Sequence, residues 1–188
     1  MSKNSKVDKE LLSILDDYHL FMDSDKTIDM PFCVNKVDNN HITSLKGETD
    51  LRAACPFGNT IIKCQVRNRN EFDYSISILS DRIKTRMLFR LDEGDGTHWN
   101  RHFPIPIEQQ QVPCPHFHKK GDDGIEYAYR TNKLEVGPSP LNIHDGFEVF
   151  CEECHIKNED VVIKVQEEGM LPFEFEQNDD PLKGINFP

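Results

Sequence analysis

Apolar and polar residues alternate along three consecutive stretches in the middle of the chain. Because successive side chains of a strand point to opposite faces, this period of two predicts strands with one buried face. Short turns join the stretches, which favours an antiparallel meander of about four or more strands over residues 61–130. The alternating positions are Ile62, Cys64 and Val66, then Phe72, Tyr74, Ile76 and Ile78, then Met87, Phe89 and Leu91, and later Ile125, Tyr127 and Tyr129.

Two segments outside this region have helical spacing instead. Residues 7–23 repeat apolar positions every three or four residues, which predicts an amphipathic N-terminal helix. Near the C-terminus, Asp145 and Glu148 have the spacing of a capping box that would start a second helix. Phe147, Phe150, Cys151 and Cys154 would share its apolar face. We therefore expect an α+β fold in which both helices pack on the meander.

The chain divides into three parts on this interpretation. Residues 1–58 hold the N-terminal helix and an irregular segment, with short strands around Cys33 and Ile42. Residues 59–168 form the α+β core domain, and residues 169–188 form an acidic C-terminal tail. Within the core, the segment from Gly94 to Pro115 is too long for a passive connection, and loops of that length tend to carry function.

Charge is distributed unevenly. Residues 145–180 contain twelve acidic residues and two lysines, so they hold ten of the eleven excess negative charges of the chain. Residues 59–90 are basic instead. This asymmetry predicts two surfaces with different partners, although a solvated acidic helix beside an ordinary basic sheet face explains it equally well. The acidic surface would present Glu152, Glu153, Glu159, Asp160, Glu167 and Glu168.

The first residues are interrupted by charges within a few positions, which fits neither a signal peptide nor a membrane span. We therefore expect a cytoplasmic protein without a membrane partner. In that compartment the six cysteines are free thiols, core residues or metal ligands rather than disulfides.

A histidine cluster is the strongest candidate for chemistry. In the segment PCPHFH an extended backbone points Cys114, His116 and His118 to one face. His98 and His102 lie in the preceding loop and would complete the site. Imidazole and thiolate suit zinc, so these five residues are the predicted metal ligands. The alternative is a polar, partly buried histidine cluster that only forms hydrogen bonds.

A rival zinc site is formed by Cys151 and Cys154, with Cys33, Cys55 or Cys64 completing it. The same segment, CEECH, has the spacing of c-type haem attachment. Because both cysteines fall on the apolar face of the expected helix, we interpret them as core residues first, and we do not expect haem.

The segments RLDEGDGTHWNRHF, PHFH, EYAYR and NIHDGFEVFCEECHI together resemble a family of uncharacterised small bacterial and phage proteins. The resemblance covers about residues 72–165 and implies a site built from Arg90, Asp92, His98, His116 and His118. The order Arg-x-Asp, His and His-x-His is also similar, more faintly, to TumE-type toxins. Both resemblances imply a bacterial or phage protein.

Three functions follow as hypotheses. The first is a zinc-binding phage or mobile-element protein whose acidic surface inhibits a CRISPR or restriction nuclease by occupying its basic nucleic-acid channel. The second is a toxin-like ribonuclease or phosphodiesterase with Arg90, His98, His116 and His118 as catalytic candidates. The third is a zinc-stabilised interaction module. Direct RNA binding would use the basic stretch with Trp99, Tyr127 and Tyr129, and the net charge of −11 opposes it.

Overall fold

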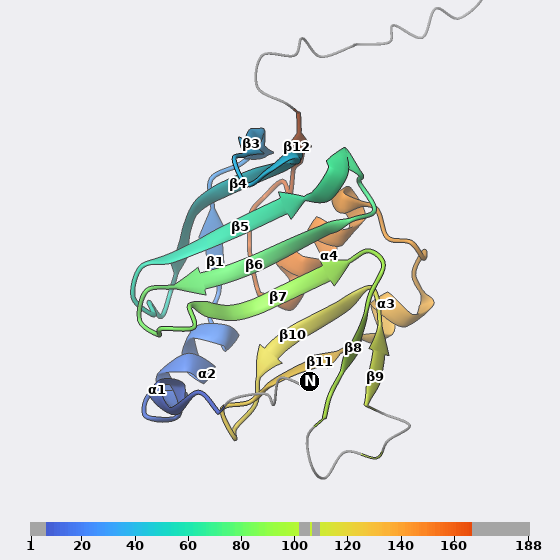
Figure 1. The fold of residues 1–188 in the computed structure, drawn as a ribbon. Helices are drawn as coiled ribbons and strands as arrows, with labels where there is room; N and C mark the ends of the chain where they lie inside the picture. Colours follow the sequence, from blue (N-terminus) through green and yellow to red (C-terminus); the bar gives the residue numbers. More distant parts are fainter. Residues whose placement is uncertain (1–6, 102–105, 107–109, 167–188) are drawn as a thin grey trace, which may run out of the picture.

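The alternating stretches form the centre of one curled antiparallel sheet in the computed structural model, which describes residues 7–101, 106 and 110–166 (Figure 1). The strand order is β1–β4–β5–β6–β7–β10–β11, and β3 pairs with β4. The antiparallel meander predicted for residues 61–130 is therefore confirmed. Its strands are β1 (Lys26–Ile28), β3 (Lys36–Asp38), β4 (His41–Ala53), β5 (Thr60–Val66), β6 (Tyr74–Ser80), β7 (Met87–Glu93), β10 (His116–Lys120) and β11 (Glu126–Tyr129).

Two small sheets complete the strands. β2 (Phe32–Val34) pairs in parallel with β12 (Ile163–Val165), and β8 (Thr97–Trp99) pairs antiparallel with β9 (Gln111–Pro113). The helical segments are α1 (Lys9–Leu12), α2 (Leu15–Asp23), α3 (Asn132–Val136), α4 (Ile143–Glu153) and the 3-10 turn η1 (Arg67–Arg69).

The expected separation of residues 1–58 from residues 59–168 does not follow a boundary in the sheet. β4, the longest strand, pairs with β5 from Leu45–Val66 to Asp50–Ile61. The short strands expected around Cys33 and Ile42 are β2 and the start of β4. The full length of β4 has no clear sequence pattern, because β4 buries Ser44 and Gly47 and exposes Ile42. The N-terminal segment thus supplies part of the same sheet.

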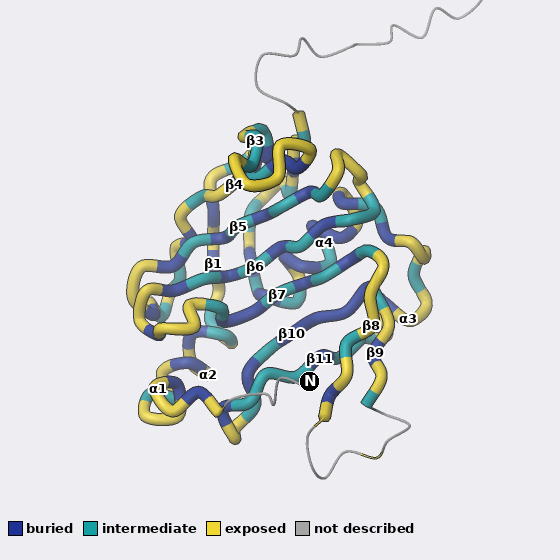
Figure 2. Tube along the Cα trace, in the orientation of Figure 1, coloured by how far each residue is buried: buried dark blue, intermediate teal, exposed yellow. Residues whose placement is uncertain are grey.

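Burial along the central strands follows the predicted period. In β5 and β6 every second residue is buried, and the side chains between them are half-buried (Figure 2). Ile62 pairs with Ile78 and Cys64 with Ile76, so these apolar positions lie side by side on one face. The sequence placed Phe72 in the same strand, but β6 begins at Tyr74 and Phe72 lies in the preceding turn.

The N-terminal helix expected over residues 7–23 is two helices. α1 starts where the Asp8 carboxylate accepts the Leu11 amide, and it ends after one turn at the Ser13 cap. α2 then continues and packs on the sheet, where the Tyr18 hydroxyl donates to the Leu88 carbonyl at 3.2 Å. The break falls at Ser13 and Ile14.

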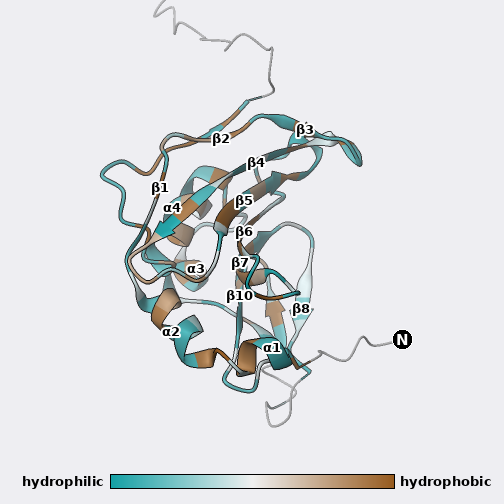
Figure 3. Ribbon diagram, turned by 90° about the vertical axis from the view of Figure 1, so that its left-hand side faces the viewer, coloured by the Kyte–Doolittle hydropathy of each residue, from teal (hydrophilic) through white to brown (hydrophobic). Residues whose placement is uncertain are grey.

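The C-terminal helix α4 starts earlier than the sequence suggested. Its N-cap is Asn142, whose side chain accepts the amides of His144 and Asp145, so Asp145 sits inside the first turn instead of capping it. Phe150 packs on Phe89 of β7 with ring centroids 5.7 Å apart, on the face of the sheet opposite to β8 (Figure 3). No helix of the described residues is long and apolar enough to cross a membrane.

Candidate metal centre

The centre begins with two neighbouring strands. β7 and β10 are antiparallel partners, with His116 opposite Asp92 and His118 opposite Arg90. Cross-strand partners project to the same face, so this register gathers the four polar side chains on one face of the sheet. Leu91 and Phe117 point to the other face and are fully buried in the core.

A hairpin supplies the third histidine. Between β7 and β10 the chain leaves the sheet, forms β8 and β9, and returns, so the hairpin lies over the polar face (Figure 1). His98 is the middle residue of β8 and is opposite Val112 of β9. It is half-buried, whereas His116 and His118 are 4% and 1% exposed, which indicates that the hairpin covers them.

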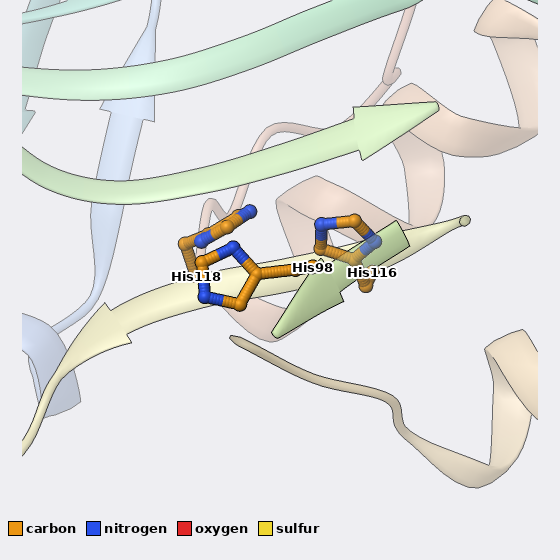
Figure 4. Close-up of side chains that lie close together, drawn as sticks. All are labelled: His98, His116 and His118. Carbon is orange, nitrogen blue, oxygen red and sulfur yellow. The ribbon is translucent and has the colours of Figure 1, made fainter. Parts of the chain in front are cut away.

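The three imidazoles converge (Figure 4). One nitrogen of each of His98, His116 and His118 lies within 4.8 Å of the others. The ring centroid of His118 is 4.7 Å from that of His98 and 4.7 Å from that of His116. This group could hold a single transition-metal ion, because imidazole nitrogens are common ligands of such ions.

Two of the three histidines are ready to act as ligands at neutral pH. Burial and the neighbouring His118 lower the pKa of His116 to about 4, and the same two causes lower the pKa of His98. Both rings are therefore neutral and each keeps a free lone pair. The Nε2 atom of His98 is buried without a hydrogen-bond partner among the described residues, which fits a position that an ion would fill.

His118 stands between two carboxylates. Its Nε2 atom is 3.2 Å from a carboxylate oxygen of Asp92, and its Nδ1 atom is 3.1 Å from a carboxylate oxygen of Glu126. Burial alone would lower the pKa of His118, but the two carboxylates outweigh burial and raise it. The two carboxylates thus stabilise the imidazolium form of His118, and a metal ion bound to this ring would take the place of a proton.

The carboxylates are ionised for the converse reason. Burial would raise the pKa values of Asp92 and Glu126, but His118 and Arg90 lower both. Arg90 lies 2.9 Å from Asp92 and 3.6 Å from Glu126, and so it links the two. A carboxylate beside a histidine ligand fixes the orientation of the ring and raises its basicity.

The histidines line an open pocket of about 450 Å³. Its wall also includes the backbone of Gly94 and Gly96 and both charged groups of the Arg67–Asp73 ion pair, which are 2.6 Å apart. The three histidines form part of this wall, while Nε2 of His98 and both ring nitrogens of His118 are buried beneath it. The whole lining is Arg67, Asp73, Arg90, Asp92, Glu93, Gly94, Asp95, Gly96, Thr97, His98, Cys114, His116 and His118.

Of the five predicted ligands, the structure groups His98, His116 and His118. Cys114 lies beside the group with its sulfur 3.5 Å from Nδ1 of His116, and burial raises the pKa of its thiol to about 11. A thiol with that pKa is protonated at neutral pH and is a poor ligand until a metal displaces the proton. His102 lies outside the described residues.

The cysteines of the rival site belong to the core. Cys151 and Cys154 are 1% and 0% exposed, and burial raises the pKa of Cys151 to about 12 and that of Cys154 well above its usual value. Among the described residues, three or more potential metal ligands come together at His98, His116 and His118. Neither Cys151 nor Cys154 belongs to a group of that kind. The apolar environment explains both positions, since a buried thiol behaves as a small hydrophobic group.

The acidic residues proposed to bind a partner differ in their exposure and in their contacts within the chain. Glu152 is exposed and pairs with Lys133, while Glu153 accepts a hydrogen bond from the Tyr129 hydroxyl at 2.6 Å. Glu159 and Asp160 are exposed in the segment after α4, and Glu167 and Glu168 lie outside the described residues. Glu152 and Glu153 therefore already have partners within the chain.

The basic residues do not form one stripe. Arg67 and Arg69 lie at the turn before β6, and Arg82, Lys84 and Arg86 lie at the turn after it, so the length of the strand separates them. Two of them are paired with α1 and α2 through Lys84–Glu10 and Arg82–Asp17. A continuous path for a phosphate backbone is therefore not formed by these side chains.

Sequence reasoning missed Glu126. The alternation of Tyr127 and Tyr129 indicates one face of β11, and Glu126 lies on the other face. The signal was present, since Glu126 and Ala128 fall on the face that the tyrosines leave free.

No protein-family model, curated protein or solved structure matches this chain. Function is consequently argued from the site.

Proposed function

We propose that this protein is a metal-dependent hydrolase that holds a divalent transition-metal ion, zinc in the first place, at His98, His116 and His118. The observation that carries the proposal is the convergence of three imidazoles on an open pocket of about 450 Å³. Catalytic zinc sites use three protein ligands and keep a position for water, whereas structural sites close around the ion with four. When bound, the ion would lower the pKa of its water and so supply a nucleophile near neutral pH.

The residues around the histidines have distinct roles in this proposal. Glu126 orients His118 through Nδ1. Asp92 is an ionised carboxylate beside Nε2 and would accept the proton that an attacking water molecule loses. Arg90 keeps both carboxylates in place. Burial keeps His116 neutral, so its lone pair is available.

The charge of the pocket favours a small substrate with little negative charge over RNA. Four carboxylates, Asp73, Asp92, Glu93 and Asp95, and two guanidinium groups line it, so a divalent ion brings the lining to neutrality. Both arginines are engaged in ion pairs, Arg67 with Asp73 and Arg90 with Asp92. A polyanion would need unpaired cations along its path. Carboxylic esters and amides fit this balance better than a phosphate ester or a nucleic acid.

The first test is the metal content of untagged protein, measured by mass spectrometry of the elements. We expect about one zinc ion per chain in the wild type. The variant His116→Ala/His118→Ala should lose the ion, and His144→Ala, which alters an exposed histidine on α4, should keep it. Equal metal in the wild type and the double variant would overturn the assignment.

The second test is activity. The metal-loaded protein is assayed on a panel of esters, amides, phosphomonoesters and RNA, with His98→Ala and Asp92→Asn as variants. We expect hydrolysis of a small carboxylic ester or amide. His98→Ala should lower it by removing a metal ligand, and Asp92→Asn should lower it by at least about 100-fold, the scale of general acid–base contributions. Rapid cleavage of RNA instead would favour the toxin-like hypothesis. Metal binding without any hydrolysis would favour the interaction module.

A further inference from the structure

We propose that Asn100 is the positioning residue of this centre: its amide fastens the β8–β9 hairpin to edge strand β11 and so brings His98 to His116 and His118. The inference rests on the proposed metal site. Asn100 is 4% exposed. Its Nδ2 donates to the Ala128 carbonyl at 2.7 Å, and its Oδ1 accepts the Ala128 amide at 2.7 Å.

This pair of bonds takes the place of a neighbouring strand. Among the described strands β11 is the last of the sheet, so its outer edge presents peptide groups that no described strand pairs with. A primary amide has the same donor and acceptor as a peptide group, and Asn100 satisfies both groups of one residue with it. Ala128 has a small side chain, so the Asn100 side chain can reach its backbone, and the contact is buried.

The register explains why this contact sets the position of His98. Asn100 directly follows β8 and is two residues from His98, so in an extended chain the two side chains project to the same face. His118 and Ala128 are cross-strand partners in β10 and β11. The hairpin therefore touches the sheet at two adjacent points, His98 on His118 with ring centroids 4.7 Å apart, and Asn100 on Ala128.

The hairpin needs such an anchor because its own pairing is short. β8 and β9 pair over three residues and form a separate two-stranded sheet without ladder bonds to the main sheet. Isolated two-stranded hairpins are marginally stable in water. At its base the hairpin is held by the Cys114 amide on the Gly96 carbonyl at 3.3 Å, and beyond His98 the buried contacts are made by Val112 and Asn100.

The chain contains a matched control at the opposite edge of the sheet. Asn158 makes the same two bonds to the backbone of Ile28 in β1, donating to its carbonyl at 2.7 Å and accepting its amide at 3.2 Å. Truncating Asn158 removes the same chemistry from an edge strand that carries no histidine of the centre. Comparing Asn100→Ala with Asn158→Ala therefore separates the effect of losing a side-chain bond to an edge strand from the effect of mispositioning His98.

The experiment titrates Co²⁺ into metal-free full-length protein and follows the visible absorption of the bound ion. We expect Asn100→Ala to weaken Co²⁺ binding about 10- to 100-fold, the range found when groups that orient metal ligands are removed. Asn158→Ala should bind Co²⁺ as the wild type does. Since Asn100 acts through His98, Asn100→Ala should weaken binding no further in a His98→Ala background.

Two results would overturn the inference: wild-type affinity in Asn100→Ala, or losses that multiply in the double variant. Should Asn100→Ala fail to fold by circular dichroism, Asn100→Asp, which keeps the acceptor and loses the donor, replaces it with the same criteria. Amide exchange at Ala128 and the proximity of the His98 and His118 rings are measured by NMR without metal. If wild-type protein binds no Co²⁺, the proposed metal site is wrong. In that case an unchanged distance between the His98 and His118 rings in Asn100→Ala would show independently that Asn100 does not position His98.

Discussion

The hydroxyl of Tyr74 lies directly against Gly146, so that a β-carbon at Gly146 would be 1.8 Å from its oxygen. The same hydroxyl donates to the Asn142 carbonyl at 3.3 Å, at the start of α4. The backbone of α4 at Gly146 therefore packs directly on the Tyr74 side chain of β6. A side chain on Gly146 would require Tyr74 or α4 to move.

We expect Gly146→Ala to lower the free energy of unfolding by about 1–3 kcal/mol or more, the cost of overpacking a filled core. Urea denaturation measures it. The added Tyr74→Phe change should recover part of the loss, because it removes the nearest atom. Glu148→Ala, on the exposed face of the same helix, is the control and should change stability little. A stable Gly146→Ala protein would contradict the observed approach of α4.

Lys26 joins the C-terminal ends of α2 and α4. Its ammonium is buried and donates to the carbonyls of Met22, Ser24 and Cys154 at 2.8–3.0 Å, which joins the ends of α2 and α4. Lys26→Met leaves these carbonyls without their donor, and unsatisfied buried groups cost about 1–3 kcal/mol each. We expect a clear fall in thermal stability, whereas Lys63→Met, at a half-buried position of β5, should have a small effect.

The stability contributed by Lys26 should depend on pH. Burial lowers its pKa from 10.5 to about 8 in the folded protein. Between these values the unfolded chain binds a proton that the folded chain has lost, so the free energy of unfolding rises with pH. The stability difference between wild type and Lys26→Met should therefore grow from pH 8 to pH 10. A difference that stays constant over this range would place the folded pKa near its usual value.

Metal should stabilise the fold. An ion that binds the folded state contributes about 2.7 kcal/mol at a free concentration of 100 times its Kd. For a chain of this size each kcal/mol corresponds to about 2–4 °C in Tm. We expect zinc to raise the Tm of the wild type by several degrees and that of His116→Ala/His118→Ala by far less. Equal shifts in both proteins would locate binding elsewhere.

Glu126 should tune metal affinity without being a ligand. Its carboxylate is 3.1 Å from Nδ1 of His118. We expect Glu126→Gln to weaken zinc binding about 10- to 100-fold by competition titration, since it removes the charge that orients the ring. Glu48→Gln, which alters an exposed carboxylate on β4, is the matched control. Unchanged affinity in Glu126→Gln would remove Glu126 from the centre.

The inhibitor hypothesis has its own test. Glu159 and Asp160 are exposed, whereas Glu153 holds Tyr129, so Glu159→Lys/Asp160→Lys reverses charge with the least disturbance of the fold. If the acidic surface docks on a nuclease channel, this variant should inhibit less, and association of the wild type should slow as salt rises. Full inhibition by the reversed protein would argue against acidic docking.

The sequence alone determined what depends on neighbours in the chain. The period of two placed β5, β6 and β7, and it put His116 with His118 and Arg90 with Asp92 on common faces, because side chains alternate along any strand. For β4 the sequence indicated only a short strand around Ile42, because burial along the rest of β4 does not follow apolar residues.

Only the tertiary structure decided which polar residues meet. His98 reaches His118 because the β8–β9 hairpin lies over the sheet, and Glu126 reaches it because β11 pairs with β10. Neither contact has a local signal, since pairing between distant segments is selected by the packing of the whole sheet. The metal centre is therefore encoded in part by the alternation of single strands and in part by a register and a docking that exist only in the folded chain.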